Sequence, residues 1–261
     1  MKRIKYILFL LLPIFFLGCE KAKVVDRASE GELTGARIRL YNFAINGLTV
    51  NFYSNETKIS ATLSTTEAEA VAGTNFGGTY PVNQYALAPV GDRNILSITP
   101  RNLATNGNVT TSSTPGSFVD GKFYSVFTCG IYDAVNKKSD AFIIEDNFPQ
   151  ELDATGAYIR IVNPCPNSNI KMVLQKTQTV GAVKTVLEEI EIGNGIAYKK
   201  SSSFVRIPPG AWELLVTDLV TAKIATRAAT SFLKERVYTI ALRGNIVTGT
   251  PATFLDNTVN K

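Results

Sequence analysis

The chain has 261 residues, and its 27 Lys and Arg against 22 Asp and Glu give a formal net charge of +5. It contains no His, which removes the commonest general base and transition-metal ligand and excludes Ser-His-Asp and Cys-His catalytic arrangements. Three of the basic residues, Lys2, Arg3 and Lys5, lie in a segment that we expect to be removed. The 24 basic residues that remain form no basic stripe with interleaved aromatics, so we expect no nucleic-acid partner.

The N-terminal residues 1–18 have the features of a lipoprotein signal peptide. A basic start precedes an apolar run from Ile7 to Leu17, which is short for a bilayer span and has the length of a signal-peptide core. The run ends F-L-G-C, which resembles the lipobox of bacterial lipoproteins, although Phe16 stands where that family usually has Leu. The resemblance implies lipidation of Cys19 and a place at the outer membrane or cell surface of a Gram-negative bacterium. The alternative is a plain signal peptide with an incidental Cys.

Residues 19–34 are expected to form a flexible tether. The segment is polar, is rich in charged residues and has no aromatic residue. Fully extended it reaches at most roughly 50 Å, so the folded part should stay near the membrane. The sequence leaves open which face of the outer membrane is used.

The first predicted domain, residues 35–150, begins with the strand pattern G-A-R-I-R-L-Y-N at Gly35–Asn42, in which apolar residues alternate with others. Two stretches, Ser64–Gly78 and Arg101–Gly116, lose the period of two, and we expect them to be long polar loops. Turn residues separate the other strand patterns. These patterns lie at Leu48–Tyr53, Ile59–Leu63, Asn94–Thr99 and Phe118–Ile131.

The second predicted domain, residues 154–261, repeats the landmarks of the first in the same order. The opening strand recurs as G-A-Y-I-R-I-V-N at Gly156–Asn163. The other landmarks that recur are Pro89 and Gly91 as Pro208 and Gly210, Phe118, Tyr124 and Gly130 as Phe232, Tyr238 and Gly244, and Asp146-Asn147 as Asp256-Asn257. Four matches in order indicate an internal duplication with shorter loops in the second copy.

The expected fold class is all-β, with two tandem immunoglobulin-like β-sandwiches, because each copy has roughly seven short strand patterns with turns about every 8–12 residues. The opening strands I-R-L-Y-N and I-R-I-V-N resemble those of a bacterial family, domain of unknown function 4397, as do the P-x-G turn and the Y-x-[VI] strand. The second copy resembles it better, because Pro166 falls on the family's Pro where the first copy has Ile45, whereas Cys165 replaces the usual Ser. The resemblance implies tandem β-sandwiches on an envelope lipoprotein and no known activity.

Cys129 and Cys165 remain once Cys19 is lipidated. Export makes a disulfide between them permissible. Because they lie in different repeats, such a bridge would clamp the two domains together and contribute roughly 3–4 kcal/mol. The alternative is two buried free thiols, and the spacing leaves both possibilities open.

Several large side chains are expected to be structural. Trp212, the single Trp, alternates with apolar residues and is predicted to lie in the core. Tyr124 and Tyr238 occupy the same repeated place and are predicted to be packed rings with hydrogen-bonded hydroxyls. Arg39 and Arg160 alternate with core Ile and Leu, so we expect them to point outward and to form at most a surface ion pair.

Three motifs with functional associations are interpreted as incidental. Gly193-Asn194-Gly195 lacks the third Gly and the helix of a dinucleotide site, and we expect it to be a hairpin turn. Ser231–Lys234 matches S-x-x-K but lies in a strand–turn context without the helix that this chemistry needs. The carboxylates around Pro149, Asp146 among them, could hold Ca²⁺, and the plainer expectation is a solvated linker.

We therefore expect a non-enzymatic, lipid-anchored envelope protein that serves as a structural or recognition module, with no catalytic residue, metal or cofactor. The alternative is a glycan-binding accessory lipoprotein of an outer-membrane uptake system. The expected partners are the membrane, through the lipid anchor, and an unknown envelope protein or glycan. Sandwich domains carry function on their end loops. The predicted binding residues are accordingly Thr65, Asn75, Asn102 and Asn106 in the two long loops.

Overall fold

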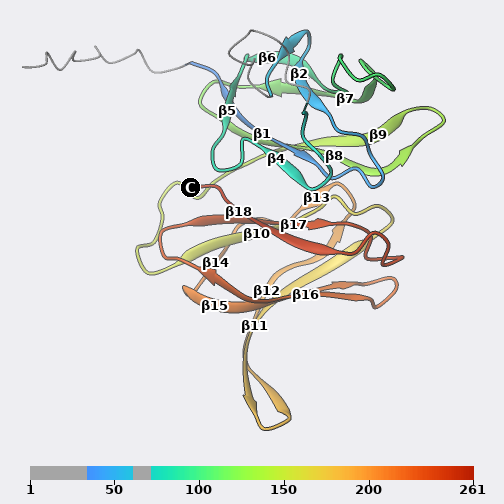
Figure 1. Ribbon diagram of the computed structural model, residues 1–261. Helices are drawn as coiled ribbons and strands as arrows, with labels where there is room; N and C mark the ends of the chain where they lie inside the picture. Colours follow the sequence, from blue (N-terminus) through green and yellow to red (C-terminus); the bar gives the residue numbers. More distant parts are fainter. Residues whose placement is uncertain (1–33, 61–71) are drawn as a thin grey trace, which may run out of the picture. The chain divides into compact units, whose positions relative to one another are not determined.

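The computed structural model describes residues 34–60 and 72–261, so the predicted signal peptide, the lipidation site at Cys19 and nearly all of the tether lie outside the described residues. Residues Gly35–Lys261 form one compact unit. Within the described residues every regular element is a β-strand (Figure 1). No helix in this part of the chain is long and apolar enough to cross a membrane.

The first copy is a sandwich of two sheets, which we call the β1 sheet and the β2 sheet. In the β1 sheet the order is β4-β1-β8-β9, and β5 also pairs with β1; in the β2 sheet it is β3-β2-β6-β7. All pairs are antiparallel except β1 with β8. The strands are β1 (Ala36–Asn42), β2 (Asn51–Ser54), β3 (Thr57–Lys58), β4 (Gly78–Tyr80), β5 (Ala86–Ala88), β6 (Gly91–Ile98), β7 (Thr110–Phe118), β8 (Phe123–Asp133) and β9 (Lys138–Glu145).

The second copy repeats this arrangement in a β10 sheet and a β11 sheet. The β10 sheet has the order β13-β10-β17-β18 with β14 also on β10, and the β11 sheet has the order β12-β11-β15-β16. Only β10 and β17 pair in parallel. The strands are β10 (Ala157–Asn163), β11 (Asn169–Val180), β12 (Val183–Ala197), β13 (Lys200–Ser201), β14 (Val205–Ile207), β15 (Gly210–Asp218), β16 (Ile224–Phe232), β17 (Val237–Arg243) and β18 (Phe254–Val259).

The two copies correspond strand for strand, so the prediction of two tandem immunoglobulin-like sandwiches from a duplication is confirmed. One landmark of the sequence alignment is wrong: the structural equivalent of Asp146 is Asn260, not Asp256. In the first copy the repeated Tyr124 pairs with Glu145, and Asp146 is the next residue. In the second copy the repeated Tyr238 pairs with Val259, and Asn260 is the next residue.

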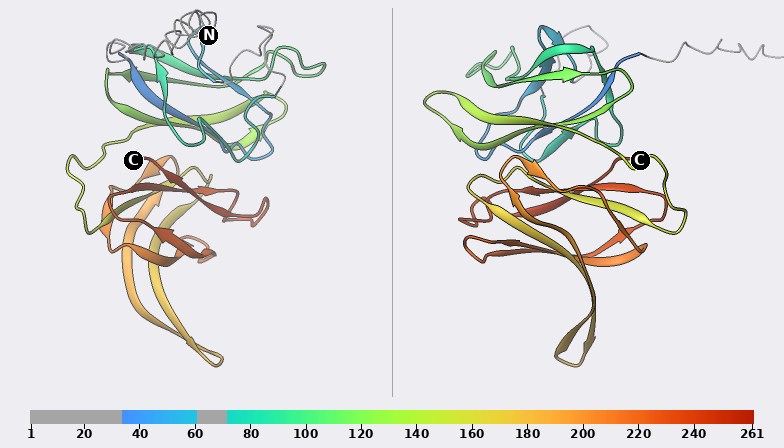
Figure 2. Two further views of the ribbon diagram at one scale, coloured as in Figure 1. Left: turned by 60° about the vertical axis from the view of Figure 1, so that its left-hand side comes forward. Right: turned by 180° about the vertical axis from the view of Figure 1, so that it is seen from behind.

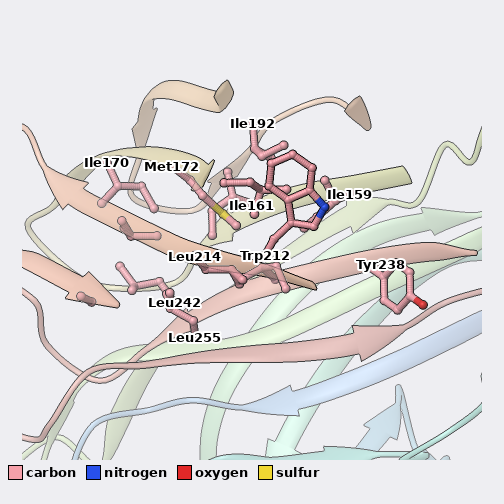
Figure 3. Packing of buried hydrophobic residues seen from close by; sticks show 14 of the residues in the cluster. Ile159, Ile161, Ile170, Met172, Ile192, Trp212, Leu214, Tyr238, Leu242 and Leu255 are labelled. Atoms are coloured by element: carbon pink, nitrogen blue, oxygen red, sulfur yellow. The ribbon is translucent and has the colours of Figure 1, made fainter. Parts of the chain in front are cut away.

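Each sandwich has its own apolar core. In the second copy, alternate residues of β10, β11, β15 and β17 meet between the sheets around Trp212, which is 1% exposed (Figure 3). The indole Nε1 of Trp212 donates to the carbonyl oxygen of Pro208 at 3.1 Å, which satisfies the one polar group of the ring. The prediction that Trp212 belongs to the core is confirmed.

The repeated tyrosines close the same corner in each copy. The hydroxyl of Tyr124 accepts a hydrogen bond from the backbone N–H of Val119 at 3.1 Å, and that of Tyr238 accepts one from Leu233 at 2.9 Å. Both rings are buried and pack edge-on against a Phe of the preceding strand. The prediction of core rings with hydrogen-bonded hydroxyls is therefore confirmed.

A third apolar cluster lies between the β1 sheet and the β10 sheet, so the two copies share a buried interface. Phe127 stacks on Tyr41 at 4.3 Å and on Phe142 at 5.1 Å between ring centroids. Val162 and Ala241 of the second copy belong to the same cluster. Since these side chains are at most 8% exposed, burial of apolar surface holds the copies together.

The same interface contains both arginines, which contradicts the expectation that they point to solvent. Arg39 is 0% exposed and Arg160 is 2% exposed. Arg160 forms an ion pair with Asp146, whose carboxylate also accepts hydrogen bonds from Tyr85 at 2.7 Å and Ser125 at 2.8 Å. Asp146 is thus a buried partner of the interface and not part of a solvated linker. Burial, together with the neighbouring Asp146 carboxylate, raises the pKa of Tyr85, so its hydroxyl stays protonated and donates.

The polar contacts are reciprocal between the copies. Arg39 donates from Nη1 to Asn260 Oδ1 at 3.0 Å, as Arg160 donates to the equivalent Asp146. The guanidinium of Arg39 lies 4.4 Å from the ring centroid of Tyr85, and that of Arg160 lies 4.8 Å from that of Phe204. Such exchange of equivalent contacts is the pattern of an isologous interface between two like subunits. The tandem copies therefore associate as a covalently linked pseudo-dimer.

Cys129 and Cys165 are both free and buried, so the possible disulfide is not formed. The Cys129 thiol lies in the interface cluster, 3.3 Å from the hydroxyl of Tyr198. The Cys165 thiol belongs to the core of the second sandwich and accepts from the backbone N–H of Ile246 at 3.4 Å. Because the two thiols pack into different clusters, the alternative of two separate buried thiols is the one that the structure shows.

Both thiols are expected to resist alkylation in the folded protein. Burial raises the pKa of Cys129 to about 12, and burial also raises the pKa of Cys165, so the reactive thiolate is scarce at pH 8. Treating the chain from Glu20 with a chromogenic disulfide reagent should modify both thiols only after denaturant is added. Rapid modification of either Cys without denaturant would contradict the burial.

Candidate functional site: a projecting β-arm

The hairpin of β11 and β12 is far longer than the sheet that carries it. β15 pairs with β11 only from Ile170 to Gln175, whereas β12 pairs with β11 as far as Val180. The residues beyond, from Lys176 to Glu188, form a two-stranded ribbon, which we call the β-arm. It extends away from the second sandwich in each view (Figure 1, Figure 2).

The β-arm is an elaboration of the second copy. Its equivalent in the first copy is the hairpin of β2 and β3, which has 4 and 2 residues, whereas β11 and β12 have 12 and 15. The rest of the second copy keeps the plan of the first. A single long extension of an otherwise conserved plan indicates a role that the sandwich itself does not require.

The turn of the hairpin corrects an expectation from the sequence. The chain reverses at Gly181, whose φ of +63° suits glycine, between the paired residues Val180 and Val183. The predicted turn at Gly193-Asn194-Gly195 lies instead inside β12, where the register shifts twice opposite β11. A Cβ on Gly193 would approach Ser202 Cβ to 3.0 Å, so this glycine permits a bulge packed closely against the next segment.

The tip of the β-arm is apolar and exposed. Val180 and Val183 are directly opposite each other, share one face of the ribbon, and are 69% and 66% exposed. A third exposed apolar residue, Leu187, lies away from the tip at the register shift next to Glu188 and is 64% exposed. Between the two valines stand only Gly181 and Ala182, so the turn itself carries no charge, and the nearest charged residue is Lys184 directly after Val183.

The base of the β-arm is charged, and it borders a groove of about 630 Å³ beside β15 and β16. Lys176 pairs with Glu188 across the ribbon at 2.6 Å, and its Nζ lies 4.2 Å from the ring centroid of Trp212. Lys184 lies next to the tip, directly after Val183, and its side chain extends back toward the sandwich to pair with Glu213 of β15 at 2.6 Å. These partly exposed pairs contribute little stability each; the first joins the two strands of the ribbon, and the second connects the ribbon to the sandwich.

The predicted loop site is only partly described. Thr65 lies outside the described residues. Asn75 forms a turn just before β4: its side-chain Oδ1 accepts from Thr49 and its backbone oxygen accepts from Gly78. The role of these residues in binding stays a prediction.

The second predicted loop is shorter than expected. β7 begins at Thr110, so Thr110–Gly116 belongs to the β2 sheet, and residues 99–109 alone connect β6 to β7. Asn102 is exposed in this connection, and Asn106 has a left-handed φ of +57° with its carbonyl oxygen bound by the hydroxyl of Thr99. The described contacts give Asn106 a turn-forming role, and binding through Asn102 stays a prediction.

The sequence did contain a signal for the β-arm. From Lys176 the chain reads K-T-Q-T-V-G-A-V-K-T-V, in which β-branched residues surround a Gly and alternate with polar ones. The Gly-Ala pair is not among the strongest hairpin turns, which made the neighbouring Gly-Asn-Gly the more prominent turn signal.

Among residues 34–60 and 72–261, no group of three or more Cys, Asp or Glu side chains is placed to hold a metal ion. The S-x-x-K residues Ser231 and Phe232 end β16 and Lys234 follows in the turn, as the strand–turn interpretation predicts.

No protein-family model matches the chain, and a comparison with curated proteins likewise gives no match. Solved structures resemble it over most of its length. A Bacteroides ovatus protein assigned to cell adhesion has 11% identity and a TM-score of 0.29 over 87% of this chain and 97% of that one. A C-terminally truncated tip fimbrial protein of Porphyromonas gingivalis has 9% identity and a TM-score of 0.29 over 87% of this chain and 99% of that one. At these values the likeness carries no argument, and the fold rests on the strand pairing of the chain itself.

Proposed function

We propose that the protein is a non-enzymatic recognition module of the cell envelope, held to the outer membrane by a lipid on Cys19, and that its β-arm contacts a partner protein. Two sandwiches joined through a buried interface provide a stable base, and the second copy adds one extended element to it. The observation that carries the proposal is the exposed apolar tip at Val180 and Val183.

The form of the β-arm favours a protein over a lipid or a glycan as its partner. Beyond Gln175, β11 pairs only with β12 in the described structure, and β12 is the last strand of its sheet. Unpaired strand edges present regularly spaced N–H and C=O groups, which another extended chain can satisfy. An added strand would bring its own side chains beside Val183 and cover the tip.

A photo-crosslinking amino acid at Val183 tests this proposal in cells. We expect one discrete adduct with a protein, because the tip is the part of the β-arm that a partner strand covers. The matched control is the same substitution at Val135, which is 89% exposed in the β8–β9 turn of the first copy. Adducts of equal yield at both positions, no adduct at Val183, or an adduct with lipid or glycan would each contradict the proposed contact.

Lipid attachment is tested separately. Cys19→Ala should abolish incorporation of a fatty-acid analogue in metabolic labelling, since the thiol is the expected acyl acceptor. Cys165→Ala is the control, because that thiol is buried in the core, and it should keep the parent's labelling. Equal label in the Cys19→Ala chain and the parent would overturn the lipid anchor.

A further inference from the structure

A second feature lies where the two copies meet, on a surface distinct from the β-arm. A groove of about 720 Å³ is bordered by β4 and the segment after it in the first copy, and by β16, β17 and β18 in the second. This volume is in the range of small-molecule sites. The residues used in the argument below are Val82 and Asn83 of the first copy and Arg227, Leu233, Arg236 and Asn257 of the second.

The groove has an excess of positive charge. Its one acidic residue, Asp256, is already paired with Arg243, from Nε to Oδ2 at 2.5 Å. Arg227 donates one hydrogen bond, from Nη1 to the carbonyl oxygen of Leu255 at 2.6 Å. Neither Arg227 nor Arg236 has a carboxylate partner among the described residues. Two guanidinium groups that border one groove without counterions favour an anionic occupant.

The other lining groups suit hydroxyl groups and a small apolar surface. Asn257 Oδ1 is buried and lacks a hydrogen-bond donor within the described part of the chain, so it can accept one from a bound molecule. Asn83 is an exposed amide in the same lining. Val82 and Leu233 are 70% and 62% exposed and provide apolar contacts.

We propose that this groove binds a carboxylated sugar, either a free uronic acid or a uronic acid residue of a glycan. The guanidinium of Arg236 would bind the carboxylate through paired N–H donors. Asn257 Oδ1 would accept from a ring hydroxyl, and Val82 with Leu233 would cover the apolar face of the ring. The proposal goes beyond the β-arm contact and stands on different residues, so either can fail without the other.

Titration calorimetry on the full-length protein in detergent tests it with galacturonic acid, trigalacturonic acid and galactotriose at low salt. We expect the acids to bind and the neutral trisaccharide not to bind. Tighter binding of the trimer than of the monomer would assign the groove to a glycan chain, and equal binding would assign it to the free sugar acid. Absence of binding by both acids, or equal binding of galactotriose, would overturn the proposal.

Two variants locate the site. Arg236→Gln should weaken binding of trigalacturonic acid at least tenfold, whereas Lys234→Gln, an exposed cation two residues earlier that does not border the groove, should change it less than twofold. Asn257→Asp should also weaken binding at least tenfold, because it places a like charge beside the ligand. Equal losses in Lys234→Gln and Arg236→Gln would show unspecific charge attraction and overturn the site.

Discussion

Replacing Arg160 by Ala is expected to lower the free energy of unfolding by about 3–5 kcal/mol, because it leaves the Asp146 carboxylate buried without its counterion. Asp146 is 3% exposed as a residue, and water cannot replace the guanidinium there without opening the interface. The hydroxyls of Tyr85 and Ser125 still donate to the carboxylate. They lessen the loss but carry no compensating charge.

Thermal unfolding followed by circular dichroism measures the effect, since each kcal/mol moves the midpoint of a chain of this size by about 2–4 °C. The control is Lys122→Ala, which removes the neighbouring pair with Glu145, where both side chains are at least one-third exposed. That change should cost about 0–1 kcal/mol. A second substitution, Asp146→Asn, should recover part of the loss in the Arg160→Ala chain, because a neutral amide needs no counterion. Equal effects of Arg160→Ala and Lys122→Ala would show that the pair is not effectively buried.

The alternation of side chains predicted most of the fold, and its limit is visible at the arginines. A period of two correctly placed Arg39 and Arg160 on the face opposite their own core, with Ile38, Leu40 and Ile159 inside. It could not tell what covers that face. In this protein the cover is the other copy, so residues that are outward in each sandwich are interior in the pair.

The long-range features escaped the sequence for related reasons. The spacing of Cys129 and Cys165 gives their separation along the chain but not the cluster into which each thiol packs. The pairing of Asp146 with Asp256 rested on identity of residue type, whereas the strand register selects Asn260. How far a hairpin projects beyond its sheet depends on where the neighbouring strand ends. The sequence does not show that β15 stops pairing with β11 at Gln175, so it could not predict how far the β-arm projects.

The two halves of the interface are equivalent in position but differ in chemistry. Arg160 forms an ion pair with Asp146 in one half. At the equivalent position in the other half, Arg39 donates a hydrogen bond to the neutral side chain of Asn260. Because the two copies are separate stretches of one chain, a substitution at this face in one copy alters only one half of the interface. The two halves have diverged accordingly, and the copies have also diverged at the β-arm, away from the shared surface.

Truncating Phe127 to Ala should cost about 3–5 kcal/mol and should separate the unfolding of the two copies. Phe127 is fully buried between the sandwiches, in contact with Tyr41, Phe43 and Phe142. Its loss leaves a cavity in the interface and not inside either core. The first copy should then unfold first, because its described core cluster contains 10 buried residues against 19 in the second.

The single Trp makes this order measurable, since Trp212 lies in the core of the second copy and its fluorescence reports that copy alone. Far-ultraviolet circular dichroism reports the strands of both copies. In the parent the two thermal transitions should coincide, and in the Phe127→Ala chain the dichroism should begin to change at a lower temperature than the fluorescence. The control is Ile131→Ala, a substitution at a 52% exposed residue of the same strand β8. The free energy of unfolding obtained from either signal should stay within about 0.5 kcal/mol of the parent's value. If the two transitions of the Phe127→Ala chain coincide at a lowered temperature, the two copies unfold as one unit even without this side chain. An unchanged midpoint would show that the interface contributes nothing to stability.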